Sequence, residues 1–407
     1  MKYLNLLLIV YFVFHYSCAE KAVSTRAEHV VIFGLDGVGT RALQLAETPE
    51  MNSMIASGAL SVNTRTVLPS NSGPTWTSLL TGTATEHHGV RNNSWRTDNY
   101  TIKPSLRTEA GYFPGIFEHI REQRPDIKSV MLYEWRGMIN MFDETVPGKV
   151  IHKTEGVDLF NAAYEVFFEE RPEFMFVAID EPDGYGHRYG YDHPEYFGCV
   201  SKYDSLIGSF IDRLCEEDML KNTVVIITSD HGGLGRGHGG DSPNEMEIPV
   251  LFYGGPVAIG KSMEHVHLIT DIIPTAAGLL GIELPKEVTG RFISEAFEPF
   301  GEMEYTPIPS VRPVDYGSIE SVTAQIVEDS KEYELSYTIF GNRVIDISIN
   351  ADFPGAEIYY TFNPDEPVSS WSRYTEPFSV DIPQVIWAIT VIDDRQSKIE
   401  RVSLTSK

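Results

Sequence analysis

Carboxylate and imidazole side chains recur in four short stretches of this chain, each of them next to glycine. The stretches are GLDG, EPDGYGH, SDHGG and GRGHGG, and they supply Asp36, Asp183, His187, Asp230, His231 and His238. Carboxylates and imidazoles without thiolates suit zinc as the bound metal, with manganese and iron as the alternatives. Six such ligands predict two ions, each keeping a position open for a substrate or a nucleophile.

The surrounding segments predict a sheet that would bring these residues together. From residue 28 to about 300, buried strand-like runs alternate with helix-like ones, which is typical of an α/β domain with a largely parallel central sheet and helices on both faces. In such sheets ligands bind beyond the carboxyl ends of the strands. Asp36, Asp183 and Asp230 each come at that end of a predicted strand. Each motif alone is more typical of a turn or a helix cap, but their agreement favours a dimetal site.

A cluster of hydroxyl side chains lies in the segment VLPSNSGPTWTSLLTG (67–82). Ser72 precedes Gly73-Pro74 and a helix-like run, so we expect it near a helix N-terminus, where backbone donors and the helix dipole favour an anion. A serine in that position is ordinarily a helix cap. Beside two metal ions it would instead be a nucleophile, because coordination lowers the pKa of the hydroxyl.

The order of the motifs resembles a known family. GLDG, PSNSGP, HHGVRNN, EPDGYGH and SDHGG, within residues 28–290, follow one another as in the alkaline phosphatase superfamily. They are most similar to its type I phosphodiesterase/nucleotide pyrophosphatase branch. This resemblance implies that one zinc ion is held by Asp36, Asp230 and His231 together with the nucleophile Ser72.

The resemblance also implies a second zinc ion and a phosphate-binding amide. Asp183, His187 and a further histidine would hold this zinc, and Asn93 in HHGVRNN would hydrogen-bond a phosphoryl oxygen. The family's third histidine often lies near the end of the catalytic domain, where this chain has VTGRFIS (288–294) and no histidine. His238 is therefore the best candidate, as in other branches of the superfamily. The alternatives, which lack a glycine-rich approach, are His193, His265 and His267.

The residues that follow Ser72 bear on the substrate. Many family members use a threonine nucleophile followed by a bulky residue, whereas here Ser72 is followed by Gly73. Bacterial alkaline phosphatases carry an arginine just after the nucleophile, which suits the dianion of a phosphate monoester. This chain continues with Pro74, Thr75 and Trp76, and Arg91 is near only in sequence. The absence of a basic residue there favours phosphodiesters.

We therefore expect an exported two-zinc phosphohydrolase in which Ser72 forms a phosphoseryl intermediate. Nucleotide-type phosphodiesters or pyrophosphates are the expected small-molecule substrates. A phosphomonoesterase that uses the same site is the alternative. A sulfatase is less favoured, because Trp76 occupies the place of the arginine in the sulfatase motif. A non-catalytic glycan-binding protein is also less favoured, because the set of ligand types is intact.

The N-terminus predicts export. A lysine, an apolar run and small residues before a cut after Ala19 are typical of a signal peptide over residues 1–19. Lipid modification at Cys18 is the alternative, so we expect a secreted or periplasmic protein or a lipoprotein. No other segment is apolar enough to span a membrane. The net charge of -26, from 32 basic and 58 acidic residues, disfavours nucleic acid polymers and anionic membranes as partners.

The pattern of predicted secondary structure changes after the expected catalytic domain (27–300). A proline-rich linker is predicted at 301–317, followed by a small β-sandwich at 318–407 that resembles the chitobiase C-terminal-like modules of secreted bacterial enzymes. Its aromatic residues could contact a glycan, but alternate strand residues are more often core, and we favour a structural role. These aromatic residues are Tyr359, Tyr360, Trp371 and Tyr374.

Two cysteines fall within the expected catalytic domain. Cys199 and Cys215 lie in one helix-like stretch, where sixteen residues at about 1.5 Å each place them too far apart for a disulfide. We expect two free, buried thiols.

Overall fold

The structure, a computed structural model, covers most of the expected catalytic domain (27–300) and most of the C-terminal part. It describes residues 27–263, 265–297, 310–313, 319–327, 332–339, 344–351, 356–392, 395–397 and 399–406. The predicted signal peptide (1–19), with Cys18, and most of the predicted linker (301–317) lie outside these residues. None of the described helices combines the length and the apolar character needed to cross a membrane.

Residues 27–297 are organised by a central sheet of eight strands in the order β4-β3-β5-β1-β6-β7-β2-β8. The strands are β1 (His29–Leu35), β2 (Ala59–Arg65), β3 (Ser129–Tyr133), β4 (Lys149–His152), β5 (Phe174–Ile179), β6 (Thr223–Thr228), β7 (Glu247–Tyr253) and β8 (Lys261–Ser262). Neighbouring strands are parallel, except that β7 is antiparallel to both β6 and β2. Strands β3, β5 and β6 are buried at every residue, as expected for apolar runs covered on both faces.

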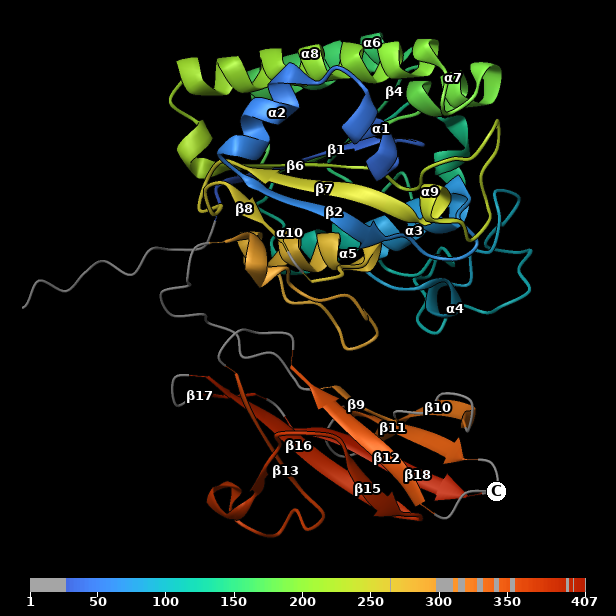
Figure 1. The fold of residues 1–407 in the computed structure, drawn as a ribbon, viewed down its shortest axis with the longest axis vertical. Helices are drawn as coiled ribbons and strands as arrows, with labels where there is room; N and C mark the ends of the chain where they lie inside the picture. Colours follow the sequence, from blue (N-terminus) through green and yellow to red (C-terminus); the bar gives the residue numbers. More distant parts are fainter. Residues whose placement is uncertain are drawn as a thin grey trace, which may run out of the picture.

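Helices cover both faces of this sheet (Figure 1). They are α1 (Thr40–Leu45), α2 (Pro49–Ala56), α3 (Ser72–Thr81), α4 (Thr85–His88), α5 (Ile116–Gln123), α6 (Gly156–Glu170), α7 (Glu181–Tyr189), α8 (Pro194–Glu216), α9 (Pro243–Met246) and α10 (Ile272–Leu280). Single 3-10 turns add η1 (Arg136–Asn140), η2 (Leu220–Asn222), η3 (Ile269–Asp271) and η4 (Ser294–Ala296).

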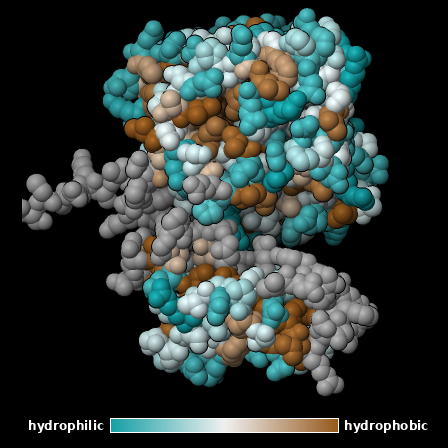
Figure 2. Space-filling model, viewed as in Figure 1, coloured by the Kyte–Doolittle hydropathy of each residue, from teal (hydrophilic) through white to brown (hydrophobic). Residues whose placement is uncertain are grey.

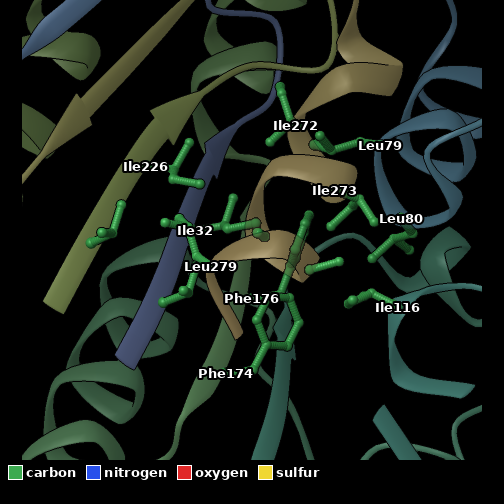
Figure 3. Close-up of a cluster of buried hydrophobic side chains, with 14 of the residues drawn as sticks. Ile32, Leu79, Leu80, Ile116, Phe174, Phe176, Ile226, Ile272, Ile273 and Leu279 are labelled. Carbon is green, nitrogen blue, oxygen red and sulfur yellow. The ribbon is translucent and has the colours of Figure 1, made fainter. Parts of the chain in front are cut away.

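The sheet separates two hydrophobic cores. One core joins the sheet to α3, α5 and α10, and Figure 3 shows Ile32, Phe176 and Ile226 from three neighbouring strands packing in it. The other core joins the opposite face to α1, α2, α6 and α8. Because successive strand residues point to opposite faces, β1 sends Ile32 into the first core and its neighbour Phe33 into the second. The α/β fold class predicted from the sequence is confirmed.

The C-terminal part is all-β over its described residues. One sheet has the order β10-β11-β18-β16-β13-β14, with β17 paired to β16, and a second has the order β15-β12-β9. The elements are β9 (Ser310–Pro313), β10 (Ile319–Val327), β11 (Glu332–Ile339), β12 (Val344–Asn350), β13 (Glu357–Thr361), η6 (Val368–Ser370), β14 (Ser372–Arg373), β15 (Phe378–Asp381), β16 (Gln384–Ile392), β17 (Arg395–Gln396) and β18 (Glu400–Ser406). The six strands expected from the sequence correspond to β11, β12, β13, β15, β16 and β18. Strand β9 lies within the range expected as linker and pairs with β12.

The aromatic residues considered for glycan contact are largely part of this β-domain's packing. Tyr360 stacks on Phe378 with ring centroids 4.3 Å apart. Trp371 is buried and donates its indole N–H to the carbonyl of Glu366 at 3.1 Å. These contacts support the structural role favoured from the sequence.

The expectation for the two cysteines needs one correction. Cys199 and Cys215 are free, as predicted, but only Cys199 is buried. Cys215 is exposed because it lies on the solvent side of α8, one residue after the buried Leu214.

The surface in view is mainly hydrophilic. Figure 2 shows hydrophobic residues in separate patches between hydrophilic ones on the visible face. This distribution is usual for a globular surface, and the patches define no single apolar face in this view.

A buried carboxylate on α8 provides a test of the packing between α2 and α8. Asp204 is fully buried and accepts hydrogen bonds from the backbone N–H groups of Met51 at 2.7 Å and Glu50 at 3.1 Å. We expect Asp204→Ala to lower the free energy of unfolding by about 2–4 kcal/mol, because two donors at the start of α2 lose a charged acceptor. Urea unfolding measures this change.

Two control variants make the test specific. Asp204→Asn keeps one acceptor oxygen and should cost less than Asp204→Ala. Asp212→Ala alters an exposed residue of the same helix and should leave the unfolding midpoint nearly unchanged. An Asp204→Ala midpoint equal to that of Asp212→Ala would contradict this account of the contact.

Candidate active site

The first group of predicted ligands forms where β1 and β6 end side by side. The two strands are parallel, and Gly34 pairs with Thr228, so Asp36 and Asp230 each lie two residues beyond a matched pair. Asp36, Asp230 and His231 are fully buried, and each offers a ligand atom within 4.8 Å of the others. The parallel register of the sheet therefore brings together residues almost two hundred positions apart.

Helix α3 brings Ser72 to the same group. Ser72 is the first residue of α3, is buried, and places its Oγ 3.3 Å from Nε2 of His231. The same Nε2 lies 3.3 Å from Oδ1 of Asp36 and 3.4 Å from Oδ2 of Asp230. Asn71, not Ser72, holds the N-cap position, and α3 begins with no side-chain cap hydrogen bond. Ser72 is thus in the helical position predicted, with its hydroxyl facing the ligands.

The second group is built from α7 and from the glycine-rich loop after β6. Asp183 and His187 lie one turn apart on α7, and Oδ2 of Asp183 is 3.1 Å from Nε2 of His187. His238 places its Nε2 3.2 Å from that of His187 and 3.8 Å from Oδ1 of Asp183. Asp183, His231 and His238 also offer ligand atoms within 4.8 Å of one another. The two groups are therefore adjacent, and His231 lies between them.

All three histidines present the same ring nitrogen to the carboxylates. Nδ1 contacts a backbone carbonyl oxygen in each ring: Gly232 for His231 at 2.8 Å, Arg236 for His187 at 2.9 Å and Ser70 for His238 at 3.0 Å. A carbonyl can only accept, so Nδ1 carries the proton and a neutral ring keeps its lone pair on Nε2. Metal-ligating histidines are typically held in this way.

A bound cation would stabilise this arrangement of lone pairs. Oδ1 of Asp36 is buried and has no hydrogen-bond partner, and the Nε2 atoms of His187 and His238 face each other at 3.2 Å. A cation between such atoms would satisfy them, whereas neutral rings and ionised carboxylates would repel. The donor set of carboxylates and imidazoles therefore fits two divalent ions of the zinc type.

Without metal, protons supply part of the missing charge. Burial, and then the nearby Asp230, raise the pKa of Asp36 well above its usual range. Burial raises the pKa of Asp230 to about 8. The hydrogen bond with Asp183 raises the pKa of His187 to about 9, and burial lowers the pKa of His231 to about 3. Metal ligands must be deprotonated, so a bound metal ion would take the place of these protons.

Asn93 lies on a loop that contacts the first turn of α3. Its Oδ1 accepts a hydrogen bond from the backbone N–H of Gly73 at 2.8 Å, while the residue itself is exposed. A Cβ atom on residue 73 would lie 2.9 Å from this oxygen and 3.0 Å from the carbonyl oxygen of Asn92. Glycine after Ser72 therefore allows the Asn93 loop to approach, and the fixed Oδ1 leaves the Nδ2 amide as the donor.

The rejected histidine candidates lie elsewhere. His193 is the N-cap of α8 and accepts from the N–H of Glu195. His265 and His267 both contact the Glu295 carboxylate, at 2.9 and 3.4 Å.

Sequence reasoning missed three residues that contact the candidate ligands and one that contacts the start of α7. Thr75 and Trp76 on α3 hydrogen-bond Asp230 and Asp36, and Tyr191 hydrogen-bonds Oδ1 of Asp183. Glu134 accepts from the N–H groups of Asp180 and Glu181, at the start of α7. The spacing of Thr75 and Trp76, three and four after Ser72, could have indicated a shared helix face. No local signal indicated Tyr191 or Glu134.

Comparison with solved structures identifies the fold. Murine ectonucleotide pyrophosphatase/phosphodiesterase 5 aligns with a TM-score of 0.56 at 17% identity, over 67% of this chain and all of that one (100%). A protein of the alkaline phosphatase superfamily from Vibrio parahaemolyticus aligns with a TM-score of 0.51 at 14% identity, over 80% of this chain and 77% of that one. The chain has an alkaline phosphatase-like fold.

Comparison of sequences identifies the family. The profile of the type I phosphodiesterase/nucleotide pyrophosphatase family matches residues 30–234, a range that includes both strand-end motifs, Ser72 and Asn93 but stops before His238. The human bis(5'-adenosyl)-triphosphatase is 28% identical over 221 residues, which are 50% of this chain and 47% of that protein. The chain belongs to the type I phosphodiesterase/nucleotide pyrophosphatase family, as its motif order predicted. It spans about half the length of the curated relatives it matches.

Metal binding to this site should release protons. At pH 7 Asp230 and His187, whose pKa values are raised to about 8 and about 9, hold protons in the metal-free protein. Ligation needs the carboxylate and the free Nε2, so zinc binding at pH 7 should release at least these two protons, and affinity should rise with pH. Calorimetric titration in two buffers of different ionisation enthalpy measures this release. A binding enthalpy that is the same in both buffers would contradict the prediction.

Proposed function

We propose that this chain hydrolyses phosphodiester or pyrophosphate bonds in nucleotide-type substrates, with Ser72 as nucleophile and two divalent ions, zinc being favoured. The observation that carries the proposal is the convergence of two ligand groups, each with histidine Nε2 atoms facing carboxylates, beside a buried serine hydroxyl. Family membership supports the reaction class. The name of one relative, a bis(5'-adenosyl)-triphosphatase, supports a nucleotide substrate.

Each group would hold one ion. The first would be held by Asp36, Ser72, Asp230 and His231, and the second by Asp183, His187 and His238. When bound, the two ions would lower the pKa of the serine hydroxyl and stabilise charge on the phosphoryl and leaving oxygens.

The chain's own residues supply the nucleophile and its orientation. The Ser72 hydroxyl gives its proton to water, Oγ bonds to phosphorus, and the bond from phosphorus to the leaving oxygen breaks, with the leaving oxygen taking up a proton from water as needed. Water then cleaves the phosphoseryl ester, which restores the hydroxyl and releases the phosphoryl product. Because Ser72 begins a helix packed into the core, its Oγ is already oriented before substrate binds.

Asn93 would bind a non-bridging phosphoryl oxygen. Gly73 donates to Oδ1 of Asn93, so the amide nitrogen is left to donate to the substrate. A fixed donor of this type stabilises charge that develops in the transition state.

The charge near Ser72 favours diesters over monoesters. The first turn of α3 contains no basic residue, and Arg91 is exposed on the loop before Asn93. A monoester dianion would lack an added cationic partner on this helix, whereas a diester carries a single negative charge. The signal peptide predicted over residues 1–19 would make this a secreted or periplasmic enzyme, with lipid attachment at Cys18 as the alternative.

Removal of the nucleophile tests the proposal. We expect purified, zinc-loaded protein to hydrolyse the nitrophenyl ester of thymidine monophosphate faster than nitrophenyl phosphate, and not to hydrolyse nitrophenyl sulfate. Ser72→Ala should lower the diester kcat/KM by more than about a thousandfold, because no other group can form the covalent intermediate. Ser72→Thr keeps a hydroxyl and should retain measurable activity, and a chelator should abolish it.

The outcomes separate the candidate functions. A dominant monoester rate would replace the proposal with a phosphomonoesterase that uses the same site. Two bound zinc ions without turnover of any of these esters would contradict the substrate class. Full diester activity in Ser72→Ala would contradict the mechanism.

Loss of the Asn93 amide should affect the transition state more than substrate binding. Asn93→Ala should lower kcat by about 10²–10³-fold, the usual effect of removing one donor to a developing oxyanion. Asn52→Ala, on the exposed side of α2, is the control and should keep the wild-type rate. Steady-state kinetics with the thymidine ester measures both, and an Asn93→Ala variant changed only in KM would argue against this role.

A further inference from the structure

One face of α3 contacts every member of the first ligand group. Thr75 and Trp76 follow Ser72 by three and four positions, which places all three residues on the same side of the helix. Ser72 Oγ is 3.3 Å from Nε2 of His231. Oγ1 of Thr75 donates to Oδ2 of Asp230 at 2.8 Å, and Nε1 of Trp76 donates to Oδ2 of Asp36 at 2.9 Å.

We propose that Trp76 is a positioning residue for the metal group, because its indole N–H fixes which oxygen of Asp36 faces the ion. The inference rests on the proposed function, since it concerns the ion that Ser72 would share. With Oδ2 of Asp36 held by the indole, Oδ1 is the oxygen without a hydrogen-bond partner, 3.3 Å from Nε2 of His231.

Trp76 carries this role more directly than Thr75. The Thr75 hydroxyl has one proton but lies 2.8 Å from the carbonyl of Asn71 and 3.1 Å from that of Ser72, as well as near Asp230. Asp230 also accepts from the backbone N–H groups of Gly37 and His231 through Oδ1. Asp36, in contrast, receives only the indole as a side-chain donor among the described residues.

The hydrophobic core has space for the indole ring beside Gly34. Trp76 is 1% exposed and packs edge-to-face on Phe176, with ring centroids 6.0 Å apart. A Cβ atom on Gly34 would lie 2.6 Å from the ring. Positions 34 and 36 are two residues apart, so a side chain at either position lies on the same face of the sheet at the end of β1. The first glycine of GLDG thus admits the ring whose N–H holds the aspartate of the same motif.

A purely packing role for Trp76 is separable from a positioning role. Trp76→Phe keeps an aromatic ring but removes the N–H donor. A second variant replaces Trp76 with benzothienylalanine, which has the shape of tryptophan with sulfur in place of N–H, and so keeps the packing if the phenylalanine variant fails to fold. Trp371→Phe is the matched control, because it removes a buried indole donor from the C-terminal β-domain.

The test measures zinc affinity at each group by competition with a chromophoric chelator, together with zinc content and the melting temperature of the metal-free protein. We expect the Trp76 variants to weaken one of the two zinc ions by about 10–100-fold, the usual effect of losing an outer hydrogen bond to a ligand. That ion should be the one lost in Asp36→Asn, and the ion lost in Asp183→Asn should be unaffected. Trp371→Phe should change neither affinity.

The outcomes distinguish this inference from the proposed function. Unchanged zinc affinity in the benzothienylalanine variant, with wild-type protein hydrolysing diesters, overturns the positioning role alone. Equal weakening of both ions overturns it too, since that result indicates a general loss of structure. Wild-type protein that binds two ions but hydrolyses no phosphate ester overturns the proposed function, while the affinity comparison still decides the role of Trp76. Wild-type protein that binds no ion overturns both.

Discussion

The structure depends on one constraint, the close approach of acidic and imidazole groups at the candidate site. Their lone pairs face each other, and most of these groups are buried. Asp36, Asp230 and His231 are fully buried, and Asp183 is nearly so. Such groups destabilise a fold unless they are paired or share a cation. Nδ1 of each histidine is committed to a backbone carbonyl, so each ring directs its Nε2 at the other members of the site. The site is therefore built around positive charge that protons supply in part.

The architecture meets this constraint by using ends of rigid elements. Parallel strands β1 and β6 place two aspartates beside each other, α7 adds two ligands one turn apart, and the glycine-rich loop after β6 adds His238. Helix α3 then brings the Ser72 hydroxyl beside the group and contacts both strand-end carboxylates through a single face. Elements buried in two hydrophobic cores thereby fix the ligand atoms.

Much of the fold, and the residues that converge at the candidate site, could be predicted from the sequence because the signals are local. Apolar runs ending in Asp, and the four-residue spacing of Asp183 and His187, are visible in short stretches of sequence. The antiparallel direction of β7 could not be predicted, because strand direction depends on pairing with distant segments. Trp76, Tyr191 and Glu134 also escaped prediction, since nothing in their neighbouring residues marks a contact with the site. Their hydrogen bonds to the site depend on packing between elements far apart in sequence.

The most direct measurement is anomalous diffraction from crystals of the zinc-loaded protein, collected on both sides of the zinc absorption edge. The account predicts two zinc peaks, one bounded by Asp36, Ser72, Asp230 and His231 and the other by Asp183, His187 and His238. Zinc–nitrogen and zinc–oxygen distances should be about 2.0–2.2 Å. A single peak, or a second ion that does not contact His187 and His238, would contradict the central claim that these two groups form a dimetal site.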